Sequence, residues 1–267
     1  MVITMRANNV LGIIYSNAYD SVLSELTNAR TMGSVPFGGR YRLIDFALSN
    51  LVNCGINKVG IITKSNYQSL MDHIGTGKPW DLSRKRGGMF LLPPFNNSHT
   101  GMYRDRIQAL RGIMRFLEQS KEEYIVLMDT NVVCNFDLND MCRAHTESGA
   151  DITIAYHHGR APRLDDLMTF TFEENQKVAK IALDPKTSKP VDYAMNIILI
   201  SKALLTRLIN NAVSLNQDSF VRDVIQHNLK RLNIYGYEIS GFTSVFDSLQ
   251  SYYDISMSLL DPANCQE

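Results

Sequence analysis

The sequence lacks the features that mark several large classes of protein. Its 267 residues contain no run of about 18 apolar residues, so no transmembrane helix is predicted. Neither sign of charge is in excess, because 27 Lys and Arg balance 27 Asp and Glu. No global field would therefore attract a nucleic acid. The N-terminus lacks the basic-then-apolar arrangement of a secretory signal, and we expect a cytoplasmic protein with neither a membrane nor a nucleic acid as its partner.

Cysteine is scarce and scattered. The four cysteines, Cys54, Cys134, Cys142 and Cys265, form no CxxC pair, which argues against a zinc site and a disulfide framework. We expect reduced thiols that pack as small apolar side chains. The sequence also has no HExxH, EF-hand, GxSxG or Walker A motif. The usual metalloprotease, calcium-binding, α/β-hydrolase and P-loop functions are therefore excluded, and no metal site is predicted.

Short apolar runs alternate with segments of helical period. Continuous β-branched runs predict buried strands at 10–14, 59–63, 124–128, 151–156 and 195–200. Helices are predicted at about 41–54, 66–74, 104–119, 138–148, 202–213, 219–230 and 248–260, the last with Asp247-Ser248 as its candidate cap. Residues 169–172 and 177–182 predict an antiparallel hairpin. The alternation predicts a three-layer α/β sandwich with a largely parallel sheet, in one domain over residues 1–267.

Ligands of such sheets bind beyond the carboxyl ends of the strands, so the loops after Ile14, Thr63, Met128 and Tyr156 are the candidates for a site. A separate candidate is the glycine-containing turn within residues 34–50. There Gly38 and Gly39 would let the backbone approach a ligand closely, and Arg40 and Arg42 could meet a phosphate. The alternative is an ordinary loop that enters a core helix, and spacing alone does not exclude it.

Two long motifs carry a resemblance to a known family. Val-Pro-Phe-Gly-Gly-Arg-Tyr-Arg-Leu-Ile-Asp-Phe at 35–46 and Gly-Lys-Pro-Trp-Asp-Leu-Ser-Arg-Lys-Arg-Gly-Gly at 77–88 resemble glucose-1-phosphate adenylyltransferase, or ADP-glucose pyrophosphorylase. The resemblance implies a Rossmann-like α/β/α sandwich of the nucleotide-diphospho-sugar transferase type. It further implies synthesis of ADP-glucose and diphosphate from ATP and glucose 1-phosphate with Mg²⁺. The family's C-terminal left-handed β-helix is expected to be missing from this chain or truncated.

The chain departs from this family where ATP and the metal would bind. The family's glycine-rich loop corresponds to residues 17–22, which contain no glycine; Asp20 would repel phosphate and Val22 takes the place of an arginine, although Arg30 survives. Asn131 and Val245 take the places of the two aspartates that the resemblance assigns to the metal.

The sugar-phosphate side departs as well. Asp184 takes the place of a lysine, and the bulky residues of 105–109 replace a segment of small ones. Tyr103 is the one sugar-side residue that matches. The ligand-binding candidates are therefore Arg30, Gly38, Gly39, Arg40 and Tyr103, and Val22, Asn131, Asp184 and Val245 are degraded positions with no catalytic residue among them.

These losses predict a regulatory, catalytically impaired subunit of glycogen synthesis, similar to the family's non-catalytic second subunit. Such a chain would need no cofactor by itself and would form a hetero-oligomer with a catalytic adenylyltransferase. One alternative is an active enzyme in which Asp129, Asp247 and Arg30 replace the lost groups. Another is a non-catalytic sensor of a sugar phosphate or nucleotide.

Residues 78–115 are basic within this neutral chain. They contain eight Lys and Arg and two Asp, a local excess of six positive charges. A solvated face is the commoner explanation of such a cluster. The functional alternative is contact with a phosphorylated effector or with an acidic patch on a partner subunit. Trp80 lies beside these residues, either packed in the core or anchoring an interface.

Overall fold

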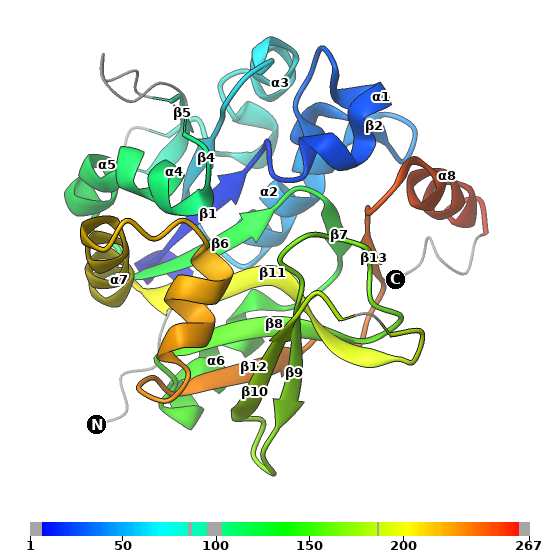
Figure 1. Ribbon diagram of the computed structural model, residues 1–267. Coiled ribbons are helices and arrows are strands. Elements are labelled where there is room, and N and C mark those ends of the chain that lie inside the picture. Colours follow the sequence, from blue (N-terminus) through cyan, green and yellow to red (C-terminus); the bar gives the residue numbers. More distant parts are fainter. Residues whose placement is uncertain (1–6, 85–86, 95–102, 186, 262–267) are drawn as a thin grey trace.

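Four parallel strands form one half of the central sheet. The structure is a computed structural model that describes residues 7–84, 87–94, 103–185 and 187–261. Strand β1 (Val10–Tyr15) lies between β4 (Lys58–Ile62) and β6 (Tyr124–Asp129), and β5 (Gly88–Leu92) pairs with the far side of β4 (Figure 1). All three pairings are parallel, so the carboxyl ends of these strands share one edge of the sheet.

The other half of the sheet contains antiparallel pairs. Strand β11 (Val191–Ser201) runs antiparallel to β6 and to β8 (Ile152–Gly159), and β12 (Ile234–Glu238) runs parallel to β8. The predicted hairpin is confirmed as β9 (Met168–Phe172) and β10 (Val178–Leu183), and it joins the sheet through pairing of β9 with β11.

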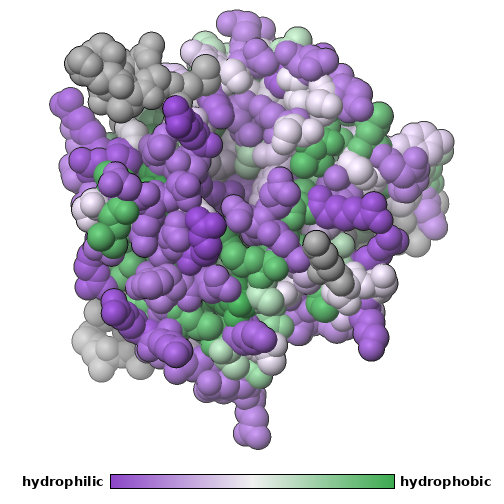
Figure 2. Space-filling model, in the orientation of Figure 1, coloured by the Kyte–Doolittle hydropathy of each residue, from purple (hydrophilic) through white to green (hydrophobic). Residues whose placement is uncertain are grey.

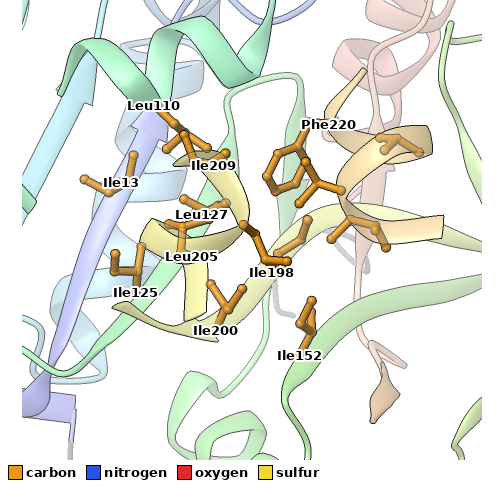
Figure 3. Close-up of a cluster of buried hydrophobic side chains, with 14 of the residues drawn as sticks. Ile13, Leu110, Ile125, Leu127, Ile152, Ile198, Ile200, Leu205, Ile209 and Phe220 are labelled. Atoms are coloured by element: carbon orange, nitrogen blue, oxygen red, sulfur yellow. The ribbon is translucent and has the colours of Figure 1, made fainter. Parts of the chain in front are cut away.

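Helices cover both faces of the sheet, which confirms the three-layer sandwich. One face packs against α4 (Arg106–Gly112), α5 (Met114–Gln119), α7 (Lys202–Ser214) and the π-helix Phe220–Ile225, which continues as the 3₁₀ turn Gln226–Asn228. The other packs against α2 (Leu43–Asn53), α3 (Gln68–Ile74) and α6 (Leu138–Ser148). Figure 3 shows the first of these cores, where Ile13, Leu127 and Ile198 of the sheet meet Leu110, Leu205 and Phe220 of the helices.

A smaller apolar cluster lies around the C-terminal helix. Helix α8 (Leu249–Ser258) begins at the predicted cap Ser248 and packs against the hairpin of β2 (Pro36–Phe37) and β3 (Tyr41–Arg42), where the Tyr252 hydroxyl donates to the Pro36 carbonyl at 2.6 Å. Strands β7 (Val132–Cys134) and β13 (Thr243–Val245) pair nearby. The remaining short elements are α1 (Ser24–Thr27) and 3₁₀ turns at Ala7–Asn9, Asp20–Leu23, Met32–Ser34 and Lys78–Trp80.

Some elements differ from the sequence-based expectation. Strands β5 and β12 were not predicted, and the single helix expected at 104–119 is divided at Ile113, whose φ of −99° and ψ of 8° interrupt the helix. The helix expected at 219–230 is the π-helix with its 3₁₀ turn. Cys54, Cys134 and Cys142 are buried free thiols, as predicted, and Cys265 lies outside the described residues. No helix in the described ranges is both long and apolar enough to span a bilayer.

Candidate functional site

Three adjacent parallel strands lead into buried polar side chains that have no partner. Tyr15 is the last residue of β1, Thr63 follows β4 directly, and Asn131 lies two residues after β6. The Tyr15 and Thr63 hydroxyls and the Asn131 amide group make no hydrogen bond with any described residue. Buried polar groups are almost always paired, so each exception needs an explanation. Because this edge is where α/β sheets bind ligands, the three groups mark it as the candidate site.

A pocket of about 240 Å³ lies at this edge. Figure 2 shows the surface hollowed above the ends of β1 and β6, with hydrophilic side chains around the hollow. The loops after β1 and β4 and residues 103–109 supply its walls. Three basic residues line it, Lys64, Arg104 and Arg106, and one acidic residue, Asp105. The lining therefore carries net positive charge, which suits an anionic ligand.

An ion pair between Arg106 and Asp129 forms one side of the pocket. The Arg106 Nη2 atom donates to both carboxylate oxygens of Asp129, at 2.6 and 2.8 Å. The Asp129 side chain is fully buried, and that of Arg106 is 16% exposed. The guanidinium also lies 4.5 Å from the centroid of the Tyr15 ring. The pair fixes the Arg106 guanidinium at the carboxyl end of β6, and Asp129 balances its charge.

Burial and pairing act in opposite directions on the two charges. Burial raises the pKa of the Asp129 carboxyl, and the adjacent Arg106 guanidinium opposes that rise. Burial has the largest single effect on Arg106 and lowers its pKa, but the charge and hydrogen bond of Asp129 together with Tyr15 and Tyr19 outweigh it, so the pKa is raised and Arg106 remains protonated. Asn196 Nδ2 donates to the Tyr19 hydroxyl at 2.9 Å, and the Asn196 side chain also lowers the pKa of the Asp129 carboxyl. A buried polar network thus connects the loop after β1 to the ion pair.

The loop after β1 is held by its own side chains. Asp20 does not line the pocket: its carboxylate accepts hydrogen bonds from the Met32 backbone N–H at 2.7 Å and from Asn17 Nδ2 at 2.6 Å. Asn17 Oδ1 accepts from the Lys64 backbone N–H at 2.7 Å. Burial raises the pKa of Asp20 to about 6. The acid that was expected to repel phosphate therefore fastens the loop in place.

Tyr103 is the one predicted ligand residue among those that line the pocket. It is half-buried, and its ring centroid lies 5.7 Å from Lys64 Nζ. Arg30 is half-buried outside the lining. Gly38, Gly39 and Arg40 form the turn between β2 and β3, beside the C-terminal helix.

The geometry of this turn explains its glycines. Gly38 and Gly39 have φ of +61° and +83°, in the region that favours glycine. Arg40 is exposed, and its guanidinium lies 5.2 Å from the Tyr41 ring centroid. Both observations fit a hairpin turn, which leads through β3 directly into α2.

The four degraded positions also lie outside the pocket lining. Val22 is partly buried against apolar neighbours, and Val245 pairs with Val132 between β13 and β7. Asp184 is exposed and accepts from the Leu167 backbone N–H at 3.2 Å. Asn131 is fully buried. These side chains serve local structure or, for Asn131, remain unpartnered among the described residues.

The side chains at this edge do not fit the Mg²⁺ that the resemblance implies. Magnesium in nucleotide sites needs one or two carboxylates with free oxygens. Arg106 occupies both oxygens of Asp129, and Asp247 accepts from the Arg163 backbone N–H at 2.8 Å and from the Ser248 hydroxyl at 3.0 Å. Across the described part of the chain, no three His, Cys, Asp or Glu side chains are grouped as metal ligands.

Sequence reasoning missed Arg106, Tyr15 and Lys64 as site residues. The available signal is the replacement of small residues by bulky ones at 105–109, which from sequence alone indicates only crowding. The basic segment is divided: Arg104 and Arg106 line the pocket, and Lys78, Arg84, Arg111 and Arg115 are exposed. Lys85 and Arg86 lie outside the described residues. Trp80 is half-buried, with its ring 6.2 Å from that of His73.

Comparisons with known proteins agree with the fold and the motifs. A sequence model of the nucleotidyl transferase family matches residues 12–256. The glycogen biosynthesis protein GlgD of Bacillus subtilis is 31% identical over 98% of this chain and 67% of its own length. A glucose-1-phosphate adenylyltransferase of Clostridium acetobutylicum is 30% identical over 97% of this chain and 70% of its own length. The chain thus spans about two thirds of these relatives.

A solved structure matches the fold over nearly the whole chain. It is described as a glucose-1-phosphate thymidylyltransferase from Bacillus anthracis in complex with a sucrose. The TM-score is 0.75, over 94% of this chain and 96% of the other, and the sequences are 18% identical. At that identity the match shows a shared fold and nothing further.

Proposed function

The chain belongs to the nucleotidyl transferase family. We propose that it is a regulatory subunit of glycogen synthesis that is catalytically impaired by itself and acts beside a glucose-1-phosphate adenylyltransferase. The names of its relatives, a glycogen biosynthesis protein and a glucose-1-phosphate adenylyltransferase, support the pathway. The ion pair at the carboxyl end of β6 supports the loss of catalysis. Where the reaction needs carboxylate oxygens open to a metal, this chain has Arg106 bound to Asp129.

The rate expected for such a site is low. Transfer of a nucleotidyl group develops charge on phosphate oxygens, which a metal ion and donors from a glycine-rich loop would stabilise. The loop here has no glycine and is fastened by Asp20, and Asn131 carries no charge. Losing one electrostatic element costs roughly 10²–10³ in rate, so losing two leaves about 10⁻⁴ or less of a normal rate.

The test is an assay of the full chain, alone and with the catalytic adenylyltransferase of the same organism. We expect no Mg²⁺-dependent release of diphosphate from ATP and glucose 1-phosphate by this chain alone. Added to the catalytic subunit, it should form a hetero-oligomer and change the rate or the response to a phosphorylated effector. An equal amount of an unrelated protein is the control. Turnover by this chain alone at a rate comparable with the catalytic subunit would refute the proposal.

The competing proposal, an active enzyme with rearranged acids, finds less support in the geometry. It needs Asp129 and Asp247 to serve a metal, whereas each already has donors on both carboxylate oxygens. If the chain alone proved active, the D129N and D247N variants would decide whether these acids carry the activity. Full activity in both variants would exclude the rearranged site.

A further inference from the structure

We propose that the pocket at the carboxyl edge of β1 and β6 binds a small phosphate-bearing ligand without a metal ion, with the fixed guanidinium of Arg106 providing hydrogen-bond donors. The proposal deepens the proposed function, because it names the ligand class of the same site. It differs from the metal-dependent chemistry that the family resemblance implies. Four features of the described residues carry it: the free donors of Arg106, the Tyr15 hydroxyl, the charge of the lining and the blocked carboxylate of Asp129.

Arg106 retains donors for a ligand although it is paired. Both of its hydrogen bonds to Asp129 come from one atom, Nη2. Nη1 and Nε, which carry three further N–H groups, have no acceptor within the described ranges. Arg106 lines the pocket and keeps some exposure to solvent. A guanidinium held on one side by a carboxylate is preorganised to bind phosphate oxygens with its remaining donors.

Tyr15 supplies a second, independent indication of a ligand. Its side chain is 5% exposed and lines the pocket, and its hydroxyl has no partner among the described residues. The Tyr15 ring lies 4.5 Å from the Arg106 guanidinium carbon. An unpaired buried hydroxyl costs free energy, and a ligand oxygen in the pocket would remove that cost.

The charge and size of the pocket favour a small anion. Lys64, Arg104 and Arg106 line it with Asp105, and Asp129 pairs with Arg106 from behind the lining, so three basic groups face two carboxylates. The Asp105 carboxylate already accepts from the Gln108 backbone N–H at 2.8 Å. The pocket has a volume of about 240 Å³. That volume is below the range of about 300–1,000 Å³ that is common for pockets of larger ligands. An inorganic phosphate or the phosphate end of a sugar phosphate fits this description better than a whole nucleotide sugar.

The proposed binding does not require a metal ion, because the carboxylate beside the pocket is already occupied. Asp129 is the carboxylate beside the pocket, and the guanidinium of Arg106 covers both of its oxygens. A divalent cation would have to displace Arg106 and would then face that buried positive charge at short range, which is unfavourable. Ligand affinity should therefore be the same with and without Mg²⁺.

Calorimetry of the full chain tests the proposal. The probes are inorganic phosphate, glucose 1-phosphate and AMP, each titrated in EDTA and again in MgCl₂. We expect at least one probe to bind saturably in EDTA, with an affinity that Mg²⁺ changes less than about twofold. Preference among the three shows whether the phosphate group suffices or a sugar or nucleoside is also recognised. Absence of binding by all three in EDTA, or binding that requires Mg²⁺, would overturn the proposal.

Three variants connect the binding to the named groups. The double variant R106Q/D129N removes both charges together, so no buried charge is left unpaired, and it should bind the probe at least tenfold more weakly. Y15F should weaken binding several-fold. R115Q, which changes an exposed arginine outside the pocket, should bind like the wild type. Wild-type affinity in the double variant would contradict the role given to Arg106.

The binding result is separable from the proposed function. If this chain made ADP-glucose alone, the regulatory proposal would fail, whereas binding in EDTA would still decide the present one. If the chain were inactive and its partner responded to it, but no probe bound in EDTA, only the metal-independent site would be refuted.

Discussion

Replacing Arg106 by Gln should destabilise the fold strongly, because the change leaves the Asp129 carboxylate buried without its partner. The Asp129 side chain is fully buried, and both of its oxygens accept from Arg106. Removing one partner of a buried ion pair costs about 3–5 kcal/mol. For a chain of this size, we expect the melting temperature to fall by roughly 10 °C. Circular dichroism during heating and in urea measures the change, with R115Q as the exposed-arginine control.

The pH dependence of R106Q gives the prediction a sign. Burial raises the pKa of Asp129, and only Arg106 and hydrogen bonding oppose that rise. Without Arg106, the folded state holds the proton to a higher pH than the unfolded state, whose carboxyl titrates near 3.8. In R106Q, the contribution of Asp129 to the free energy of unfolding is therefore fully present below about pH 4 and is lost as pH rises. The difference between R106Q and the wild type should therefore be small near pH 4 and large at pH 7.

The double variant R106Q/D129N separates a lost pair from a damaged core. Its two neutral amides leave no buried charge, so its cost should be about 2–4 kcal/mol less than the sum of the two single changes. Additive costs, or a loss in R106Q below about 1 kcal/mol at pH 7, would show that the two residues are not the coupled buried pair described above.

Three further changes have outcomes that the structure determines. Y15F should leave stability unchanged or raise it by about 1 kcal/mol, because the hydroxyl it removes is buried and unpaired; thermal melting measures this. G236A should cost about 1–3 kcal/mol in urea unfolding, because a Cβ there would lie 2.5 Å from Phe172 and 2.8 Å from Tyr156. The folded pKa of Asp20 is about 6, against an ordinary 3.8, so its contribution to stability is lost as pH rises from about 4 to 6. The melting temperature of D20N relative to wild type should rise over that interval.

Much of the sheet could be predicted because its central strands have a distinctive sequence pattern. Strands β1, β4, β6, β8 and β11 are β-branched runs buried on both faces, a pattern that few other structures share. Strand β5, Gly-Met-Phe-Leu-Leu, has no β-branched residue, and β12 contains a glycine among its five residues. These strands form because β4 and β8 offer a neighbouring edge, and that is tertiary information.

The site was harder to predict because its central contact joins distant positions. Arg106 and Asp129 are 23 residues apart, one at the start of a helix and one at the end of a strand. From sequence, Arg106 is one of several bulky residues in place of small ones, and Asp129 is an acid two residues from the expected position. Nothing in their spacing indicates that the two side chains form an ion pair. The Gly38-Gly39 turn shows the opposite difficulty. Its glycines have the positive φ that a turn requires, but the turn lies against α8 and away from the pocket lining.

The distribution of unpaired groups supports the proposal that the carboxyl edge binds a ligand. Four described residues have buried side-chain atoms without a hydrogen-bond partner, namely Tyr15, Thr63, Glu122 and Asn131, although Glu122 Oε2 lies 3.6 Å from Lys58 Nζ in an ion pair. Three of them end or follow the parallel strands β1, β4 and β6 at one edge, whereas Glu122 precedes β6. Each such group costs about 1–3 kcal/mol, and a buried ion pair is often no more stable than an apolar pair of similar volume. Stability alone therefore does not account for these side chains. Violations of local rules concentrate at functional sites. Of the three groups at this edge, Tyr15 lines the pocket beside Arg106, and the ligand proposed above would complete the hydrogen bond of its hydroxyl.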